Sequence, residues 1–352
     1  MKRGGQTTST VDRYGIPALF VVGGLTQYVG AAIGVFLFDT LDPAAVAWLR
    51  ALGAAGVLLA WRRPWRRRTG ADRWTRRRIT IATLFGLATV GMNVVFYEAI
   101  ARIPLGAAVA IEFLGPIAVA AAGSKRPRDV VALALVVLGV LAIASAQLGS
   151  GAVGIPGVGF ALASAALWAA YILLGKRVAD AGSGIDDLAV GMAGASIIFA
   201  PVLVGPVLAV HAGVFLEPRV WILGLGVGVL SSVVPYVLDQ VVLVRIGRAR
   251  FALLLALLPT TATIVGAVVL AQLPTVAEGL GIVAVVVAVT IGGSAAAGTA
   301  RPTDAIPPPK YSDSSSGVPC GRGQWRAWPR RLHLCCTSAP SKPGFRPAPA
   351  EN

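Results

Sequence analysis

Apolar stretches of about 20 residues follow one another almost without interruption as far as residue 297. Each stretch, folded as an α-helix, is long enough to cross about 30 Å of hydrocarbon. Charged residues make up only 13% of the chain, which is about half their share in soluble domains. The stretches are continuously apolar and do not alternate residue by residue, which argues against a transmembrane β-barrel. The sequence therefore predicts an all-α polytopic membrane protein.

Ten transmembrane helices are predicted, in two groups of five. The first group occupies residues 16–148 and the second occupies residues 155–297, after a short N-terminal segment, residues 1–15. The predicted helices cover residues 16–38, 43–61, 79–100, 104–123, 129–148, 155–175, 187–209, 220–243, 249–271 and 277–297. Residues 298–352 are basic and rich in proline and serine, a composition that predicts a disordered tail.

Basic residues are unevenly divided between alternate loops. The formal net charge of +15 is concentrated at the N-terminus, in the arginine-rich loop from Arg62 to Arg78, and in later loops on the same side. The opposite loops contain Arg102 and Arg219 beside several acidic residues. The positive-inside rule therefore predicts that both termini, including the tail, lie in the cytoplasm. We expect the loop from Arg62 to Arg78 to contact anionic lipid head groups, and we expect no nucleic-acid partner.

The two groups of helices show a weak internal repeat at an offset of 143 residues. At this offset Pro116 aligns with Pro259, and Arg102 aligns with Arg245. Because each group contains an odd number of helices, the second group must be inverted relative to the first. Inverted repeats are typical of secondary transporters, whose two halves exchange conformations and open a central site to alternate sides. The alternative is an old duplication in a protein without alternating access.

Two carboxylates lie deep in predicted helices. Glu112 follows Pro104 by eight residues, about 12 Å into the membrane, where a charged carboxylate is costly unless it is paired or faces water. Either Glu112 is a protonated acid that bonds to a neighbouring helix, or it lines a cavity and binds substrate or a proton. Asp239 precedes Arg245 by six residues. It either lines the cytoplasmic part of that cavity or pairs with a basic residue of the adjoining turn.

Polar and aromatic residues on two other helices are further candidates for a cavity. Gln27 and Tyr28 lie on the first predicted helix, and Trp168 and Tyr171 lie on the sixth. Rings with polar tips suit a cavity for an amino-acid-sized ligand, although they serve core packing equally well. Arg50 lies about one and a half turns into the second helix, close enough for its guanidinium to reach the membrane surface.

Three prolines, Pro116, Pro235 and Pro259, lie within predicted helices. Because proline removes a backbone hydrogen bond, we interpret these positions as candidate hinges. Glu98 precedes Arg102 by four residues, the favourable order for an ion pair on one helix.

The chain carries no motif for catalysis or for a cofactor. It has no H-E-x-x-H motif and no glycine-rich phosphate loop, and its three cysteines all lie in the tail. An enzyme within the membrane would need a nucleophile or metal ligands at depth. We therefore expect neither an enzyme nor a metal or cofactor site, and transport would have to be driven by an ion gradient.

Five stretches of the chain carry a resemblance to a known family. They are QYVGAAIGVFLF (27–38), AVAWLRA (45–51), YEAIARIPLGAAVAIEFLGP (97–116), LWAAYILLGKRV (167–178) and SSVVPYVLDQVVLVRI (231–246). With these stretches the chain resembles the EamA-type carriers of the drug/metabolite transporter (DMT) superfamily, most closely the RhtA-like branch of threonine/homoserine exporters.

The resemblance implies a carrier of the bacterial cytoplasmic membrane that exports amino acids or related metabolites. We expect the protein to be a monomer or a homodimer. It also implies a central cavity formed mainly by helices three, four, eight and nine, which adds Asn93, Tyr97 and Tyr236 to Glu112 and Asp239 as cavity candidates. Proton coupling through Glu112 is our leading hypothesis. The alternatives are broader efflux of drugs or hydrophobic metabolites and, in another class, a membrane scaffold that docks partners on its basic loop and tail.

The chain departs from the family pattern at two places. Leu258-Pro259 stands where the family usually has Glu-Pro, and Leu270-Ala271-Gln272 stands where it usually has Leu-Gly-Glu. Loss of both acids is expected to alter substrate choice or coupling.

Overall fold

The computed structural model describes residues 10–66, 74–123, 126–148, 154–180, 184–239, 242 and 254–297. In this part of the chain every regular element is a helix, which confirms the all-α fold class. The predictions for the tail, for the start of the N-terminal segment and for the middle of the arginine-rich loop fall outside these residues.

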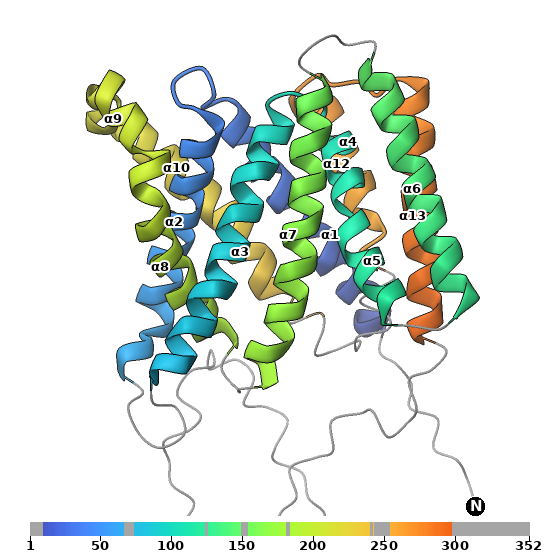
Figure 1. Cartoon of the computed structure of the whole chain (residues 1–352), viewed down its shortest axis with the longest axis horizontal. Helices are drawn as coiled ribbons and strands as arrows, with labels where there is room; N and C mark the ends of the chain where they lie inside the picture. Colours follow the sequence, from blue (N-terminus) through green and yellow to red (C-terminus); the bar gives the residue numbers. More distant parts are fainter. Residues whose placement is uncertain are drawn as a thin grey trace, which may run out of the picture. The chain divides into compact units, whose positions relative to one another are not determined.

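The helices follow the predicted order along the chain (Figure 1). The first half contains α1 (Thr10–Val35), α2 (Pro43–Arg62), η1 (Pro64–Arg66), α3 (Arg76–Ile100), α4 (Leu105–Glu112), α5 (Leu114–Ala122) and α6 (Pro127–Leu148). The second half contains α7 (Gly154–Asp180), α8 (Gly184–Leu203), α9 (Gly205–His211), η4 (Ala212–Leu216), α10 (Pro218–Gly228), the π-helix η5 (Val229–Val233), α12 (Leu257–Val269) and α13 (Val276–Ala297). After η5 the chain continues as α-helix to Asp239.

A described helix lies within each of the ten predicted membrane segments, and the end of the eighth and the start of the ninth fall outside the described residues. Eight segments are long and apolar enough to cross a membrane, and shorter apolar helices include α12 and most of α13. The fourth predicted helix is interrupted at Phe113, between α4 and α5, and the seventh is interrupted at Val204, between α8 and α9. The chain is therefore a helical polytopic membrane protein.

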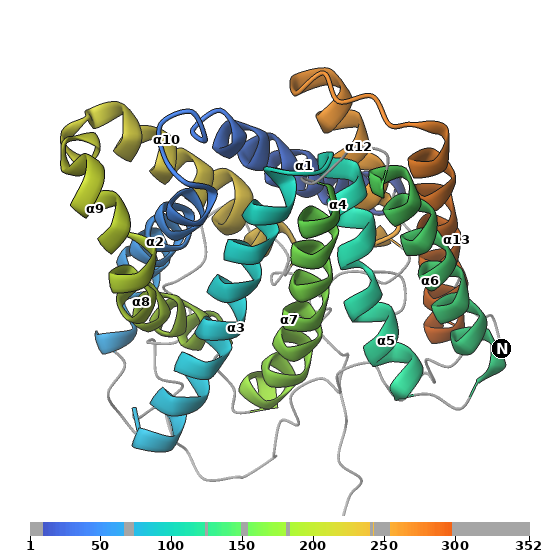
Figure 2. The same ribbon diagram turned by 45° about the horizontal axis from the view of Figure 1, so that its top comes forward.

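Contacts between helices repeat from one half to the other. The contact of α2 with α10 corresponds to that of α8 with α3, and the contact of α1 with α12 corresponds to that of α7 with α4 and α5. The final helices of the two halves, α6 and α13, lie side by side in Figures 1 and 2 and pack on each other. An approximate two-fold relation between the halves predicts this pattern of contacts.

Glycines permit the closest crossings between these helices. At the crossing of α3 and α8, a Cβ atom on Gly86 would overlap the backbone of Gly191. At the crossing of α6 and α13, a Cβ atom on Gly139 would lie 2.7 Å from the carbonyl oxygen of Gly281. Small residues are the usual means by which helices pack tightly in membranes, where the hydrophobic effect gives no preference for helix over lipid.

Two ion pairs connect the first turn of α8 with α2 and α3. Arg62 Nε lies 2.7 Å from Asp186 Oδ1, and Arg78 Nε lies 2.8 Å from Asp187 Oδ1. Both aspartate side chains are almost fully buried, at 6% and 3% exposed. Both carboxylates also lie near the N-terminus of α8, where the helix dipole stabilises negative charge. These pairs therefore join the two halves at one end of the helices.

Arg62→Gln is expected to lower the free energy of unfolding by about 1–3 kcal/mol, because it removes the cation beside a buried carboxylate. Thermal unfolding in detergent measures this effect, with Arg76→Gln as control because Arg76 is exposed at the start of α3. A double-mutant cycle with Asp186→Asn isolates the pair. Additive effects of the two substitutions would show that the pair contributes no stability.

Candidate functional site

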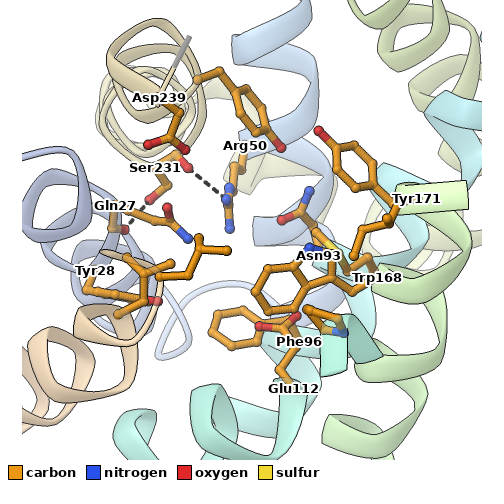
Figure 3. Close-up of a pocket in the computed structure, with 16 residues that line it drawn as sticks. Gln27, Tyr28, Arg50, Asn93, Phe96, Glu112, Trp168, Tyr171, Ser231 and Asp239 are labelled. Atoms are coloured by element: carbon orange, nitrogen blue, oxygen red, sulfur yellow. Dashed lines mark hydrogen bonds between the residues drawn. The ribbon is translucent and has the colours of Figure 1, made fainter. Parts of the chain in front are cut away.

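One cavity of about 310 Å³ lies between helices of both halves. A cavity of this volume accommodates a small organic molecule. Its walls come from α1, α2, α3, α4, α5, α7, the helix that contains η5, and the start of α12 with the residues before it (Figure 3). The lining residues are Gln27, Tyr28, Arg50, Met92, Asn93, Phe96, Glu112, Pro116, Trp168, Tyr171, Ile172, Ser231, Tyr236, Asp239, Leu255 and Leu258.

The cavity contains all but one of the residues that the sequence suggests for a substrate site. Those present are Gln27, Tyr28, Asn93, Glu112, Trp168, Tyr171, Tyr236 and Asp239. The first, second and sixth predicted helices therefore contribute to the wall, in addition to the four helices that the family resemblance implies.

Tyr97 is the exception and does not line the cavity. It is fully buried, and its ring centroid lies 5.6 Å from the guanidinium carbon of Arg50. Phe38 and Phe96 pack on the same ring edge-to-face, at centroid distances of 6.0 Å and 6.2 Å. Tyr97 is therefore a supporting residue behind Arg50, because neighbouring rings and the cation occupy its surroundings.

Glu112 is the last residue of α4 and is 9% exposed. The hydroxyl of Ser164 on α7 forms a hydrogen bond with its Oε1 atom and also lies 3.2 Å from the carbonyl oxygen of Met92. A serine hydroxyl has only one hydrogen to donate. Ser164 can therefore donate to an ionised Glu112, or donate to Met92 while it accepts a hydrogen bond from a protonated Glu112. Both protonation states of the carboxyl group have a partner.

Two of the candidate hinge prolines lie just after interruptions in their helices. Pro116 lies in the first turn of α5, and Pro259 lies in the first turn of α12. Because proline has no N–H group, neither can donate to the carbonyl oxygen four residues earlier, in Glu112 and Leu255 respectively. Both of those residues line the cavity. Interrupted helices thus border the cavity in both halves, and hinge motion at these prolines remains a prediction.

Arg50 is a cavity residue that was not among the candidates predicted from the sequence. It is 5% exposed; its Nη2 atom donates to the carbonyl oxygen of Ser231 at 2.8 Å, and its Nε atom donates to Ser232 Oγ at 3.0 Å. Pro235, the third candidate hinge, cannot donate to the Ser231 oxygen, and the guanidinium of Arg50 uses this acceptor. Because α2 is apolar all round, its sequence gives no sign of which face carries Arg50.

The helix around Ser231 is a π-helix that also contacts α1. Ser231 Oγ donates to the carbonyl oxygen of Gln27 at 2.9 Å, which Figure 3 shows beside the bond from Arg50. A Cβ atom on Gly30 would lie 2.9 Å from Leu230 Cβ, so glycine is needed for this close approach. Helix α1 and η5 therefore hold the acceptor of Arg50 in place.

The two departures from the family pattern have different locations. Leu258 lines the cavity, so its apolar side chain changes the surface that meets a ligand. Gln272 lies outside the cavity, and its Oε1 atom accepts a hydrogen bond of 3.0 Å from the backbone N–H of Leu105, at the start of α4. Next to it, Ala271 adopts the left-handed φ of 54° that favours glycine. The second departure therefore concerns the stability of a helix terminus.

Comparisons with known proteins agree with this architecture. Residues 155–292 match the EamA-like transporter family. The threonine/homoserine exporter RhtA of Salmonella typhimurium (strain LT2) is 37% identical over 240 residues, which are 68% of this chain and 78% of that protein. The same exporter of Escherichia coli (strain K12) is 35% identical over the same shares. A solved crystal structure, at 16% identity and a TM-score of 0.51, covers 81% of this chain and 98% of its own and supports the fold alone.

Proposed function

The chain belongs to the EamA-like transporter family, in its RhtA-like branch, and we propose that it exports amino acids or related small metabolites across the bacterial cytoplasmic membrane, with both termini in the cytoplasm. One observation carries the proposal. A single cavity between the two halves contains the buried cation of Arg50 together with the carboxyl groups of Glu112 and Asp239. Ionisable groups buried within membrane helices are typical of substrate and proton pathways.

Alternating access is the mechanism that we propose for this export. Helix contacts that repeat between the halves supply two similar units that can exchange conformations. The cavity lies where these units meet, and interrupted helices from both units border it. Rocking of one unit against the other would expose the cavity to each side of the membrane in turn.

Coupling to protons is proposed on the basis of Glu112. Its carboxyl group is buried in the cavity wall, and Ser164 can serve as partner to either protonation state. A group with a partner in both states can bind and release a proton without leaving a buried polar atom unpaired. The sequence has no glycine-rich phosphate loop that would supply energy from ATP.

Efflux from liposomes tests the proposal. The full chain is reconstituted, the liposomes are loaded with labelled L-threonine or L-homoserine, and the outside is acidified. We expect efflux to exceed that from liposomes without protein, to increase with the imposed proton gradient, and to slow when a protonophore is added. Efflux of both amino acids no faster than from protein-free liposomes would overturn the assignment to this substrate class.

Export of a broader range of hydrophobic compounds is a second candidate. The apolar side chain of Leu258 favours it, because this residue meets the ligand where the family usually has glutamate. Leu255, the position aligned with Glu112 in the second half, is also apolar and lines the cavity. A panel of dyes and apolar amines in the same efflux assay separates the two candidates, since an amino-acid exporter leaves the panel inside.

A further inference from the structure

We propose that Arg50 and Asp239 bind the two ends of a zwitterionic substrate, Arg50 its carboxylate and Asp239 its ammonium group. This inference rests on the proposed function, and it assigns the groups of the substrate to particular side chains of the cavity. Glu112 keeps its proposed role as the proton-binding residue.

Arg50 is a buried cation that has no ion-pair partner among the described residues. Its two hydrogen bonds go to neutral oxygen atoms, on Ser231 and Ser232, and its guanidinium carbon lies 5.6 Å from the ring centroid of Tyr97. Within the residues that the structure describes, no carboxylate forms an ion pair with it. A guanidinium has five N–H groups, so donors remain for a ligand. A buried charge is costly without a counter-charge. A carboxylate ligand supplies one and can accept two parallel hydrogen bonds from a guanidinium.

The guanidinium of Arg50 is also held in a fixed position. Ser231 is itself bonded to α1, and Pro235 leaves the Ser231 carbonyl without its usual helical donor. Tyr97, behind the guanidinium, is fully buried and packed against other rings. Arg50 therefore keeps one orientation at the cavity wall before a ligand arrives, and preorganisation of this kind increases affinity and selectivity.

The opposite charge for the ligand comes from Asp239. This residue lines the same cavity from the helical segment that follows η5, and Figure 3 shows its carboxylate and the guanidinium of Arg50 as separate groups. No ion pair joins these two side chains, and no described basic residue pairs with Asp239. A cation and an anion that share a cavity without pairing provide complementary sites for the two charged ends of an amino acid.

The remaining charged group, Glu112, already has a partner and is less available for the ammonium group. Ser164 bonds to its carboxyl oxygen, and the hydroxyl of Ser164 is completely buried on α7. Aromatic side chains, including Phe96 and Trp168, line much of the remaining wall and can contact the substrate side chain. The assignment thus gives each of the three charged groups of the cavity a separate role.

Competition by analogues that lack one charge tests the assignment. Exchange of labelled L-threonine is measured in liposomes containing the full chain, against unlabelled threonine, threoninamide and N-acetylthreonine at one pH. The amide lacks the carboxylate, and the acetyl derivative lacks the ammonium group. We expect the wild-type protein to bind threonine at least about 30-fold more tightly than either analogue, the factor lost when one partner of a buried charge pair is removed.

Arg50→Gln should weaken threonine binding to about the level of the amide, leave binding of the amide little changed, and preserve the preference over N-acetylthreonine. Asp239→Asn should give the opposite pattern and abolish only the preference over the acetyl derivative. Arg50→Lys keeps the charge and should restore part of the preference for a carboxylate. Ser232→Ala, which removes one anchor of the guanidinium and keeps its charge, should weaken this preference without abolishing it.

The two proposals fail in different ways. Wild-type protein that exchanges neither threonine nor homoserine would overturn the proposed function. Exchange that is normal in the wild type, together with unchanged discrimination against threoninamide in Arg50→Gln, would overturn the role of Arg50 alone. If Arg50→Gln is not folded, as judged by its thermal midpoint, Arg50→Lys and Ser232→Ala decide the matter. An unchanged preference for the carboxylate in both variants would then contradict the assignment.

Discussion

Glu112→Gln is expected to slow proton-driven efflux by about 100-fold, the scale of effect when a positioned proton-transfer group is lost. Glutamine has nearly the same shape and can still bond to Ser164, so the cavity wall is preserved. Its amide cannot take up and release a proton, so the residual efflux should no longer depend on pH. Exchange of threonine under equal pH on both sides needs no net proton movement and should persist.

Two further variants test whether the effect of Glu112→Gln is specific to the loss of its carboxyl group. Glu98→Gln changes a carboxylate that forms an ion pair of 2.5 Å with Arg102 and does not line the cavity, so efflux should remain normal. Ser164→Ala keeps the carboxyl group of Glu112 and removes its partner, so efflux should fall but stay dependent on pH. Glu112→Gln protein with normal efflux and a normal pH profile would rule out proton coupling through this residue.

Gly86→Ala is expected to reduce the free energy of unfolding by about 1–3 kcal/mol. The added methyl group would meet backbone atoms of Gly191, and backbone cannot rotate away as a side chain can. Helices α3 and α8 would have to separate along their whole crossing. Because α3 also carries Asn93 and Phe96 into the cavity, efflux should decline together with stability.

Gly56→Ala is the matched control for Gly86→Ala. Both glycines lie inside helices, but a Cβ atom on Gly56 would have no neighbouring atom within 4 Å. Alanine favours a helix over glycine by about 1 kcal/mol, so this variant should be as stable as the wild type or more stable. Thermal midpoints in one detergent compare the two. Equal midpoints would show that the α3–α8 crossing tolerates a larger spacing than we infer.

The sequence predicted the helices well because length and hydropathy determine which segments can cross a membrane. It also identified the positions of Glu112 and Asp239, since a carboxylate among apolar residues is conspicuous. Pro116 and Pro259 marked helix interruptions. The break in the fourth segment falls at Phe113, before Pro116, because a missing N–H acts on the preceding turn.

The orientation of side chains around each helix could not be predicted in the same way. In a membrane both the lipid-facing and the protein-facing surfaces are apolar, so periodicity does not distinguish them. Arg50 was therefore not predicted as a cavity residue, and Tyr97 was wrongly predicted to line the cavity. The internal repeat likewise predicts the position of a cavity residue but not the chemistry of its side chain. Leu255 lines the cavity at the position aligned with Glu112, but its side chain is apolar, whereas Glu112 has a carboxyl group.

The π-helix η5 has a consequence for the angular position of every residue that follows it. A π turn takes in one more residue than an α turn, and one residue corresponds to a rotation of about 100° around a helix axis. If residues 229–233 adopted ordinary α-helical geometry, Tyr236 and Asp239 would turn away from the cavity by that angle. One surplus residue thus determines the helical phase at which two lining side chains are presented. Deleting one residue of η5 would let this turn return to α-helical geometry while Tyr236 and Asp239 keep their phase.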